Sequence, residues 1–295
     1  MPTDPMSLWK NYHLSHTIQD ALQVLSAYPG PARIIAGGTD LLLDLQQARH
    51  PPVDLLVDVT AVPELNCLEI RGFELFIGAA VPLRVMTVSP LVHRHARALQ
   101  EASALIGGPQ VRNTATLGGN VAHALPAADG TIALIALNAQ AEIASLDGIR
   151  RAPILDLFKG PGQSSLDARH DLLVGFYLPL IRSGQASAFA RVMRPQGVAI
   201  AILNLAVWLE RAGDRIVDVR VSLGPAGPVP RRSASAEKIL HGQPLTAELM
   251  SQAARGVLDD AHFRASPHRS SAEYRKHLSR VLLDQVVHTA WDRAV

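Results

Sequence analysis

Two glycine pairs constrain this chain more than any other feature of its sequence. They lie in Ile35-Ala36-Gly37-Gly38-Thr39-Asp40-Leu41 and, about eighty residues further on, in Thr116-Leu117-Gly118-Gly119-Asn120. A glycine lets backbone N–H groups approach a ligand where a Cβ atom would intervene, which suits the binding of a phosphate. The sequence therefore predicts two backbone segments that contact a phosphate-bearing ligand.

Composition sets the class of protein that carries these segments. The 295 residues are enough for two domains, and 48% are apolar while 18% are charged, which indicates a compact soluble protein without long disorder. The formal charge is only +2, with lysines and arginines scattered among acidic residues. This distribution argues against nucleic acid as a partner.

Cysteine use and hydropathy exclude further classes. The single cysteine, Cys67, can form no internal disulfide and cannot hold an iron–sulfur cluster by itself. The N-terminus lacks the pattern of a secretory signal, so we expect a cytoplasmic protein. The apolar stretches at 131–144 and 198–209 are too short to span a bilayer, and membrane association is not expected.

The pattern of apolar residues predicts an α+β fold. Strand, glycine turn and helix follow one another at 33–47, and alternation after Pro179 predicts an antiparallel meander. A polar loop at 107–116 is expected to deliver the second glycine pair. The other expected elements are helices at 18–27, 91–106, 129–138, 234–241, 248–258 and 272–293, strands at 55–59 and 172–178, hairpins at 68–79 and 141–154, and meander strands at 186–193, 200–210 and 216–223.

Taken alone, the first pair has two interpretations. A Gly-Gly after a strand is commonly a structural turn, and the three-glycine dinucleotide fingerprint is absent. Thr39 and Asp40 favour a ligand site, because a hydroxyl and successive amides at a helix start suit a pyrophosphate.

The second motif, residues 111–129, leaves two alternatives open as well. Asn120 could bond a ligand phosphate or fix the turn. Asp129 could accept from ribose hydroxyls or cap the following helix. No catalytic acid, base or nucleophile set emerges, and His93-x-His95 is better explained by a solvated helix face than by a metal site.

Together the two motifs resemble the FAD-binding subunits of the molybdenum hydroxylases, a family that includes xanthine dehydrogenase, carbon monoxide dehydrogenase and 4-hydroxybenzoyl-CoA reductase. The resemblance rests on Ala-Gly-Gly-Thr-Asp-Leu at 36–41, Gly-Pro-Gln-Val-Arg-Asn-Thr-Ala-Thr-Leu-Gly-Gly-Asn at 108–120 and Pro-Ala-Ala-Asp at 126–129. It covers nearly the whole chain. Within the family, the chain resembles the xanthine dehydrogenase type, because it has Thr39-Asp40 in the first motif and lacks a cysteine-rich insertion after the second.

The resemblance implies a two-lobed PCMH-type FAD-binding domain at 1–180, with lobes at about 1–59 and 60–180. It implies a second domain at 181–295, similar to the C-terminal domain of the carbon monoxide dehydrogenase flavoprotein, with an antiparallel sheet and helices. It also implies non-covalent FAD, with the molybdenum cofactor and the [2Fe-2S] clusters only on partner subunits.

The same resemblance assigns roles to residues. The first motif would wrap the FAD pyrophosphate with its amides, Thr116, Gly119 and Asn120 would complete the cradle, and Asp129 would bind a ribose or a nearby hydroxyl. Ile106 would pack near the flavin, and Leu173 would touch the adenine end. The expected cofactor residues are Ile34, Ile35, Ala36, Gly37, Gly38, Thr39, Asp40, Leu41, Ile106, Thr116, Gly119, Asn120, Asp129 and Leu173.

One position departs from the family pattern. Some relatives have a lysine beside the cofactor where this chain has Ala190, so that contact is missing or is supplied by Arg191 or Arg194. The loop at 194–198 is the expected route for nicotinamide access.

The function that the resemblance implies is electron relay. FAD would pass electrons from [2Fe-2S] centres on a small subunit to NAD or another acceptor, while a large molybdopterin-binding subunit hydroxylates the substrate. The alternatives are a stand-alone PCMH-type flavin oxidoreductase and a non-catalytic, nucleotide-binding assembly subunit.

Overall fold

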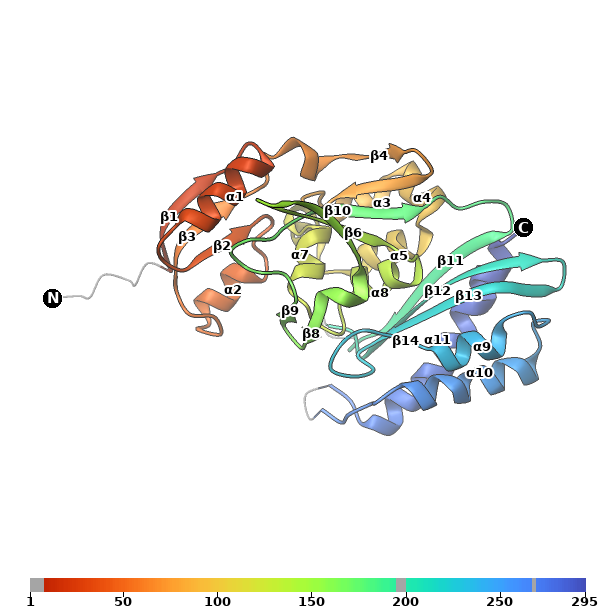
Figure 1. The fold of residues 1–295 in the computed structure, drawn as a ribbon. Helices are drawn as coiled ribbons and strands as arrows, with labels where there is room; N and C mark the ends of the chain where they lie inside the picture. The colour runs from red at the N-terminus through yellow and green to blue at the C-terminus, as the bar shows by residue number, and fades with distance from the viewer. Residues whose placement is uncertain (1–7, 195–199, 267–268) are drawn as a thin grey trace.

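The structure, a computed structural model, describes residues 8–194, 200–266 and 269–295. Strands in these residues form sheets of three, five, four and two strands, and helices cover them (Figure 1). Within the described ranges no helix is long and apolar enough to cross a membrane.

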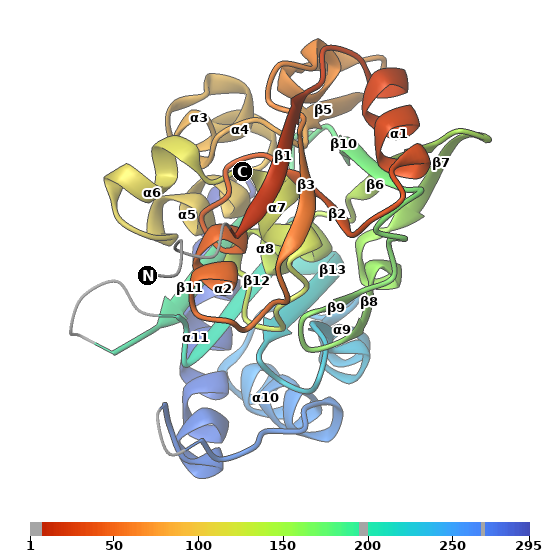
Figure 2. The same ribbon diagram turned by 90° about the vertical axis from the view of Figure 1, so that its left-hand side faces the viewer.

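The N-terminal lobe is a parallel sheet in the order β1-β3-β2 (Figure 2). Its first helix begins where predicted, because the Thr17 hydroxyl accepts a hydrogen bond from the Asp20 amide at 3.0 Å. The sheet register sets Ile35 beside Asp58, so the glycine turn leaves the carboxyl end of β2. The elements are β1 (Trp9–Leu14), α1 (Ile18–Ala27), β2 (Ala32–Ile35), α2 (Leu41–Gln46) and β3 (Val53–Asp58).

The second lobe is built on an antiparallel sheet in the order β4-β5-β10-β6-β7. Phe76 and Phe176 are fully buried on its two central strands. Its strands are β4 (Leu68–Arg71), β5 (Glu74–Gly78), β6 (Gln140–Ser145), β7 (Gly148–Pro153) and β10 (Leu172–Pro179), with the small pair β8 (Phe158–Gly160) and β9 (Gln163–Ser164). Its helices are α3 (Leu83–Val88), α4 (Pro90–His95), α5 (Arg97–Leu105), α6 (Pro109–Thr114), α7 (Leu117–Ala122) and α8 (Asp129–Ala136), with short 3-10 turns at η1 (Pro63–Asn66) and η2 (Ile154–Leu157).

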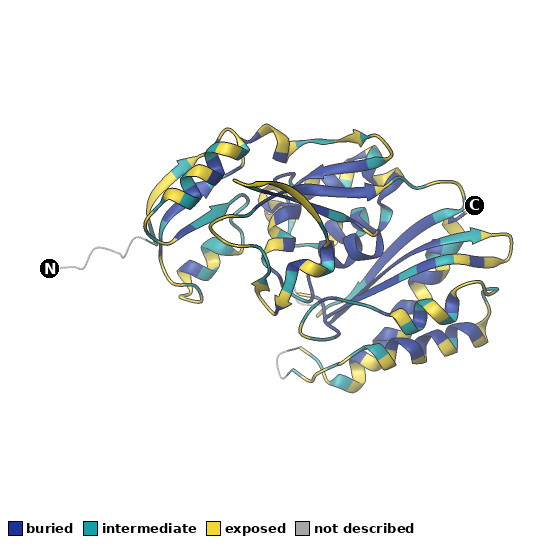
Figure 3. Cartoon of the chain, in the orientation of Figure 1, coloured by how far each residue is buried: buried dark blue, intermediate teal, exposed yellow. Residues whose placement is uncertain are grey.

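The C-terminal part is an antiparallel meander in the order β11-β12-β13-β14. One face carries Phe189, Ala206 and Trp208 into the core that the first two lobes share, and the other face packs on the C-terminal helices. Figure 3 shows these strands as a largely buried layer. The elements are β11 (Gln185–Val192), β12 (Leu203–Ala212), β13 (Arg215–Gly224), β14 (Arg231–Arg232), α9 (Ala234–Leu240), α10 (Ala247–Asp260) and α11 (Ala272–Arg293).

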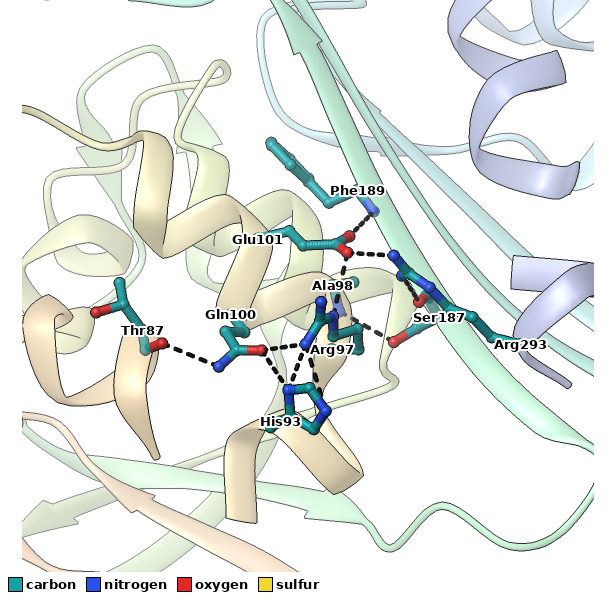
Figure 4. Close-up of polar contacts among 9 residues, drawn as sticks. All are labelled: Thr87, His93, Arg97, Ala98, Gln100, Glu101, Ser187, Phe189 and Arg293. Carbon is teal, nitrogen blue, oxygen red and sulfur yellow. Dashed lines mark hydrogen bonds and ion pairs between the residues drawn. The ribbon is translucent and has the colours of Figure 1, made fainter. Parts of the chain in front are cut away.

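Side chains fasten the outer edge of β11 to both parts of the molecule. The Glu101 carboxylate on α5 accepts from the Phe189 amide at 2.9 Å and from Arg293 of α11 at 2.6 Å (Figure 4). Arg293 also donates to the Ser187 carbonyl at 2.9 Å, and the Ser187 hydroxyl accepts from the Ala98 amide at 3.1 Å. An exposed strand edge leaves such backbone groups unpaired, so these contacts both protect the edge and join the domains.

Most predicted elements match observed ones, and three differ. The helix expected at 91–106 is two helices, α4 and α5, because Ala96 between them has a φ of −144° and a ψ of 50°. The expected polar loop at 107–116 contains α6. The second glycine pair lies inside the first turn of α7 and not in a loop. A one-residue break and helices of only six residues leave no distinct period of about 3.6 residues in the sequence.

Candidate functional site

The first glycine pair forms the turn between β2 and α2. Gly38 has a φ of 65°, a region that glycine enters without a steric penalty. The backbone N–H groups of residues 37–40 have no acceptor among the residues that the structure describes. Successive free N–H groups in a turn with a left-handed residue suit the oxygens of a phosphate.

Two polar side chains follow this turn and remain free. The Asp40 carboxylate makes no capping bond at the start of α2, and neither it nor the Thr39 hydroxyl has a partner among residues 8–194, 200–266 and 269–295. The apolar side chains of the motif pack inside the protein: Ile34 packs on the core that both lobes share, and Ile35 and Leu41 pack in a small cluster of the N-terminal lobe.

The first turn lies directly against the second motif. A Cβ atom built on Gly37 would stand 2.2 Å from the carbonyl oxygen of Thr114 and 2.8 Å from the Cα atom of Ala115. Only glycine permits this approach, so Gly37 brings the two motifs together through backbone contact.

The second glycine pair has a different role. Thr116 is the N-cap of α7, and its hydroxyl accepts from the Gly119 amide at 3.1 Å. The Gly118 amide donates to the carbonyl oxygen of Ala79 at 2.9 Å, and a Cβ atom there would lie 2.6 Å from the Ala79 Cβ. Because both amides already have acceptors, the free donors of this site lie in the first motif.

Asn120 and Asp129 have partners within the protein. The Asn120 side-chain oxygen accepts from the Thr131 amide at 3.2 Å and thereby ties α7 to α8. Asp129 lies in the first turn of α8, is 4% exposed, and pairs with the buried Arg191 guanidinium. Its second oxygen accepts from the Asn204 amide group at 2.6 Å. Burial raises the pKa of the Asp129 carboxyl, and Arg191 and Asn204 oppose that rise.

Sequence reasoning did not find Asn204, and it considered Arg191 only as a substitute contact beside Ala190. Arg191 extends from β11 to Asp129 and to the Leu105 carbonyl oxygen at the end of α5. A buried aspartate requires a cationic or hydrogen-bonding partner, but a sequence does not say which residue, 62 positions away, supplies it.

The remaining expected residues lie around these motifs. Ile106 ends α5 and packs on the core, and its carbonyl oxygen accepts from Arg112 at 3.2 Å. Leu173 is buried on β10, next to Val174, whose carbonyl accepts from the Ala79 amide at 2.8 Å. Ala190 is buried on β11. The loop expected to admit nicotinamide, at 194–198, lies outside the described residues apart from Arg194.

The chemistry of this site is binding. No group of three or more His, Cys, Asp or Glu side chains that could hold a metal occurs within the described ranges. Cys67 is half-buried, and its thiol donates to the Pro63 carbonyl at 3.4 Å. Free backbone donors beside a free hydroxyl fit the pyrophosphate of a nucleotide cofactor. Fold and site thus define an α+β protein with a set of free donors suited to such a cofactor where the turn after β2 meets the segment that leads into α7.

Comparison with known proteins agrees with this class. Residues 6–181 match the FAD binding domain in molybdopterin dehydrogenase, and residues 187–290 match the CO dehydrogenase flavoprotein C-terminal domain. The chain is 31% identical over 287 residues to the xanthine dehydrogenase FAD-binding subunit of Escherichia coli O157:H7, covering 95% of each chain. It is 31% identical over 268 residues to the nicotinate dehydrogenase FAD-subunit of Eubacterium barkeri, covering 88% of each.

A solved structure shows the same fold. A chain of carbon monoxide dehydrogenase from Hydrogenophaga pseudoflava superimposes with a TM-score of 0.92 at 26% identity, over 97% of this chain and 98% of that one. The chain therefore belongs to the FAD-binding subunits of the molybdenum hydroxylases, and FAD is its cofactor. The predicted family and α+β fold class are confirmed.

Proposed function

We propose that this chain relays electrons within a molybdenum hydroxylase complex. Its FAD would receive electrons from [2Fe-2S] centres on a small subunit and deliver them to NAD or another acceptor, with a large molybdopterin-binding subunit as the site of substrate oxidation. Two observations support this role: the relatives are named as FAD-binding subunits, and one cysteine cannot hold a cluster. When bound, FAD supplies the redox chemistry, so the chain needs residues that hold and orient the cofactor.

The proposed cradle is formed by part of the residue set expected from the sequence. The amides of residues 37–40 bind the pyrophosphate, and the Thr39 hydroxyl adds a further donor. Thr116, Gly119 and Asn120 fix the start of α7 against it. A carboxylate has about four acceptor positions, so Asp129 can accept from a ribose hydroxyl while it bonds to Arg191 and Asn204.

The free amides of residues 37–40 are the observation on which this cradle depends. Hydrogen exchange tests them directly. Without FAD these amides should exchange rapidly, and saturating FAD should slow them at least tenfold. The Gly118 amide, which donates to Ala79, is the internal control and should be slow in both cases. Unchanged exchange at 37–40 with FAD bound would refute the cradle.

Two other functions remain to be distinguished. A stand-alone flavin oxidoreductase would oxidise an organic substrate without partners, whereas the relay requires co-purification with a large and a small subunit. A non-catalytic assembly subunit would be colourless and would not be reconstituted with FAD. The division at residues 180 and 181 and the cytoplasmic location stay predictions.

A further inference from the structure

A groove of about 520 Å³ lies where the two domains meet, apart from the glycine motifs. Its lining comes from the β4–β5 turn, the end of α4, the segment between β10 and β11, and strands β12 and β13. Its volume falls within the range of small-molecule sites. None of the proposed cofactor residues lines it. Asp129 starts α8 while Leu137, at the groove, follows its last turn, about 12 Å away along the helix.

The free charge in this groove is positive. The guanidinium groups of Arg94 and Arg182 have no partner within the described part of the chain. The two carboxylates of the groove have other partners, and together with Arg220 the charged side chains of the lining leave one net positive charge. Glu210 accepts from the Gln185 amide group at 3.0 Å, and Asp218 lies 3.5 Å from the Arg220 guanidinium. Guanidinium groups bind carboxylate and phosphate oxygens with paired hydrogen bonds, so the free pair favours an anionic ligand.

A buried histidine without a partner points to the same groove. The solvated helix face expected for His95 is wrong, because the side chain is only 6% exposed. It lines the groove, and its Nδ1 atom makes no hydrogen bond within the described residues. Burial, and then the charge of Arg94, lower the pKa of His95, so the ring is neutral near pH 7. Buried polar side chains are nearly always hydrogen-bonded in native proteins, and a polar ligand in the groove would provide a partner.

The walls of the groove are apolar. Leu180 and Ile181 line it beside Phe73, which is 89% exposed at the tip of the β4–β5 turn. The Arg220 guanidinium stacks on the Trp208 ring at 4.0 Å and forms the opposite side. Charged donors beside apolar walls are typical of sites that bind small organic molecules with one anionic group.

We propose that this groove binds a small organic anion, with its carboxylate or phosphate group held by Arg94 and Arg182 and its apolar body against Phe73, Leu180 and Ile181. The ligand would contact both domains. A bound ligand would therefore stabilise the contact between the two domains. The groove is separate from the proposed FAD cradle.

Calorimetric titration of the full chain tests this proposal with phenylacetate and phenyl phosphate as probes. Arg94→Gln and Arg182→Gln should each weaken binding about tenfold, because each removes a charge-assisted pair of hydrogen bonds. Arg280→Gln, on exposed surface of α11, is the matched control and should bind as the wild type does. Acetate and inorganic phosphate should bind more weakly than the aryl probes, because they lack the apolar body.

Each outcome decides the proposal. Preference for phenyl phosphate or for phenylacetate identifies the anionic group and supports the site. FAD affinity of both groove variants should equal that of the wild type, which separates this site from the cradle. The proposal is overturned by equal binding in wild type and groove variants, by an equal loss in Arg280→Gln, or by no saturable binding at millimolar concentrations.

Discussion

Four glycines that form two similar pairs in the sequence have different physical roles. Gly37 allows backbone to approach backbone, and Gly38 takes up a left-handed conformation. Gly118 permits close contact with Ala79, whereas a Cβ atom on Gly119 would meet only the Thr116 hydroxyl, at 3.2 Å. Among the four, Gly119 alone combines a helical backbone with open space, so a substitution there separates cofactor binding from stability.

This contrast predicts different outcomes for two alanine variants. Gly118→Ala should lower the free energy of unfolding by about 2 kcal/mol, because the added methyl overlaps Ala79. Gly119→Ala should change it by less than about 1 kcal/mol, because the better helix propensity of alanine offsets a slight crowding of Thr116. The FAD affinity of Gly119→Ala should fall at least tenfold, as measured by fluorescence titration, because the added methyl would enter the space proposed for the cofactor. Wild-type FAD affinity in Gly119→Ala would remove Gly119 from the cradle.

The Asp129–Arg191 pair makes a second prediction, about stability. Both side chains are 5% exposed, so Asp129→Asn leaves a buried guanidinium without a counter-charge and should cost about 3 kcal/mol in urea unfolding. Asp214→Asn is the control, because its pair with Arg215 at 4.0 Å is exposed and contributes little. A loss as small as that of the control would show that Asp129 is not held by Arg191.

Tyr12 provides a prediction that concerns pH. Its hydroxyl donates to the Asp58 carboxylate, which favours the protonated phenol and raises the pKa of Tyr12 to about 12 from an ordinary 10.0. Between these values the folded chain binds more protons than the unfolded one, so the free energy of unfolding should fall as pH rises from 10 to 12. Ultraviolet titration should show a tyrosine transition near 12 that Tyr12→Phe abolishes. A spectrum unchanged by that substitution would contradict the assignment.

At the scale of elements, the sequence predicts what local periodicity and turn residues determine. Helix α1, with its Thr17 cap, and the β6–β7 hairpin at Asp147-Gly148 follow from such signals, and both are observed. The meander is also observed, and β12 shows a nearly continuous apolar run because its two faces are buried in two different hydrophobic cores.

Elements that tertiary contacts determine could not be predicted. Strand β1 exists through its parallel pairing with β3, although its own residues are mostly exposed. The break at Ala96 lets α5 turn toward β11, where the Ala98 amide meets Ser187. For the same reason the sequence predicted the glycine turn after β2 but not the Asp129–Arg191–Asn204 contacts, which join α8 to two strands of the other domain.

Glu101 tests the contact between α5 and β11. Glu101→Gln keeps an oxygen for the Phe189 amide but removes the charge that pairs with Arg293, so it should lower the free energy of unfolding by about 1 to 2 kcal/mol. Glu248→Gln is the matched control. Its pair with Arg255, at 3.8 Å and at least 70% exposed on both sides, should contribute almost nothing. Equal effects in denaturant unfolding would show that the Glu101 contacts do not join the domains.

At the scale of the whole molecule, two cores share one sheet. The meander contributes Phe189, Ala206 and Trp208 to the core of the FAD-binding part and its other face to the C-terminal helices. The turn proposed to hold the cofactor lies at one end of this continuous body (Figure 1), and the groove proposed to bind an organic anion lies at the junction of the domains. Such a body suits a subunit whose contribution is to hold a redox cofactor in a fixed place for partners.

The relay predicts how the isolated chain and the complex should differ. The FAD-loaded chain alone should lose the visible absorbance of oxidised flavin when NADH is added, because NADH can deliver a hydride to it directly. Xanthine, chosen because a relative is a xanthine dehydrogenase subunit, should leave that absorbance unchanged in the isolated chain. With the large and small subunits present, the oxidisable substrate of the complex should bleach the flavin. Bleaching of the isolated chain by xanthine would contradict the relay and favour a stand-alone oxidoreductase, because no partner would then be needed.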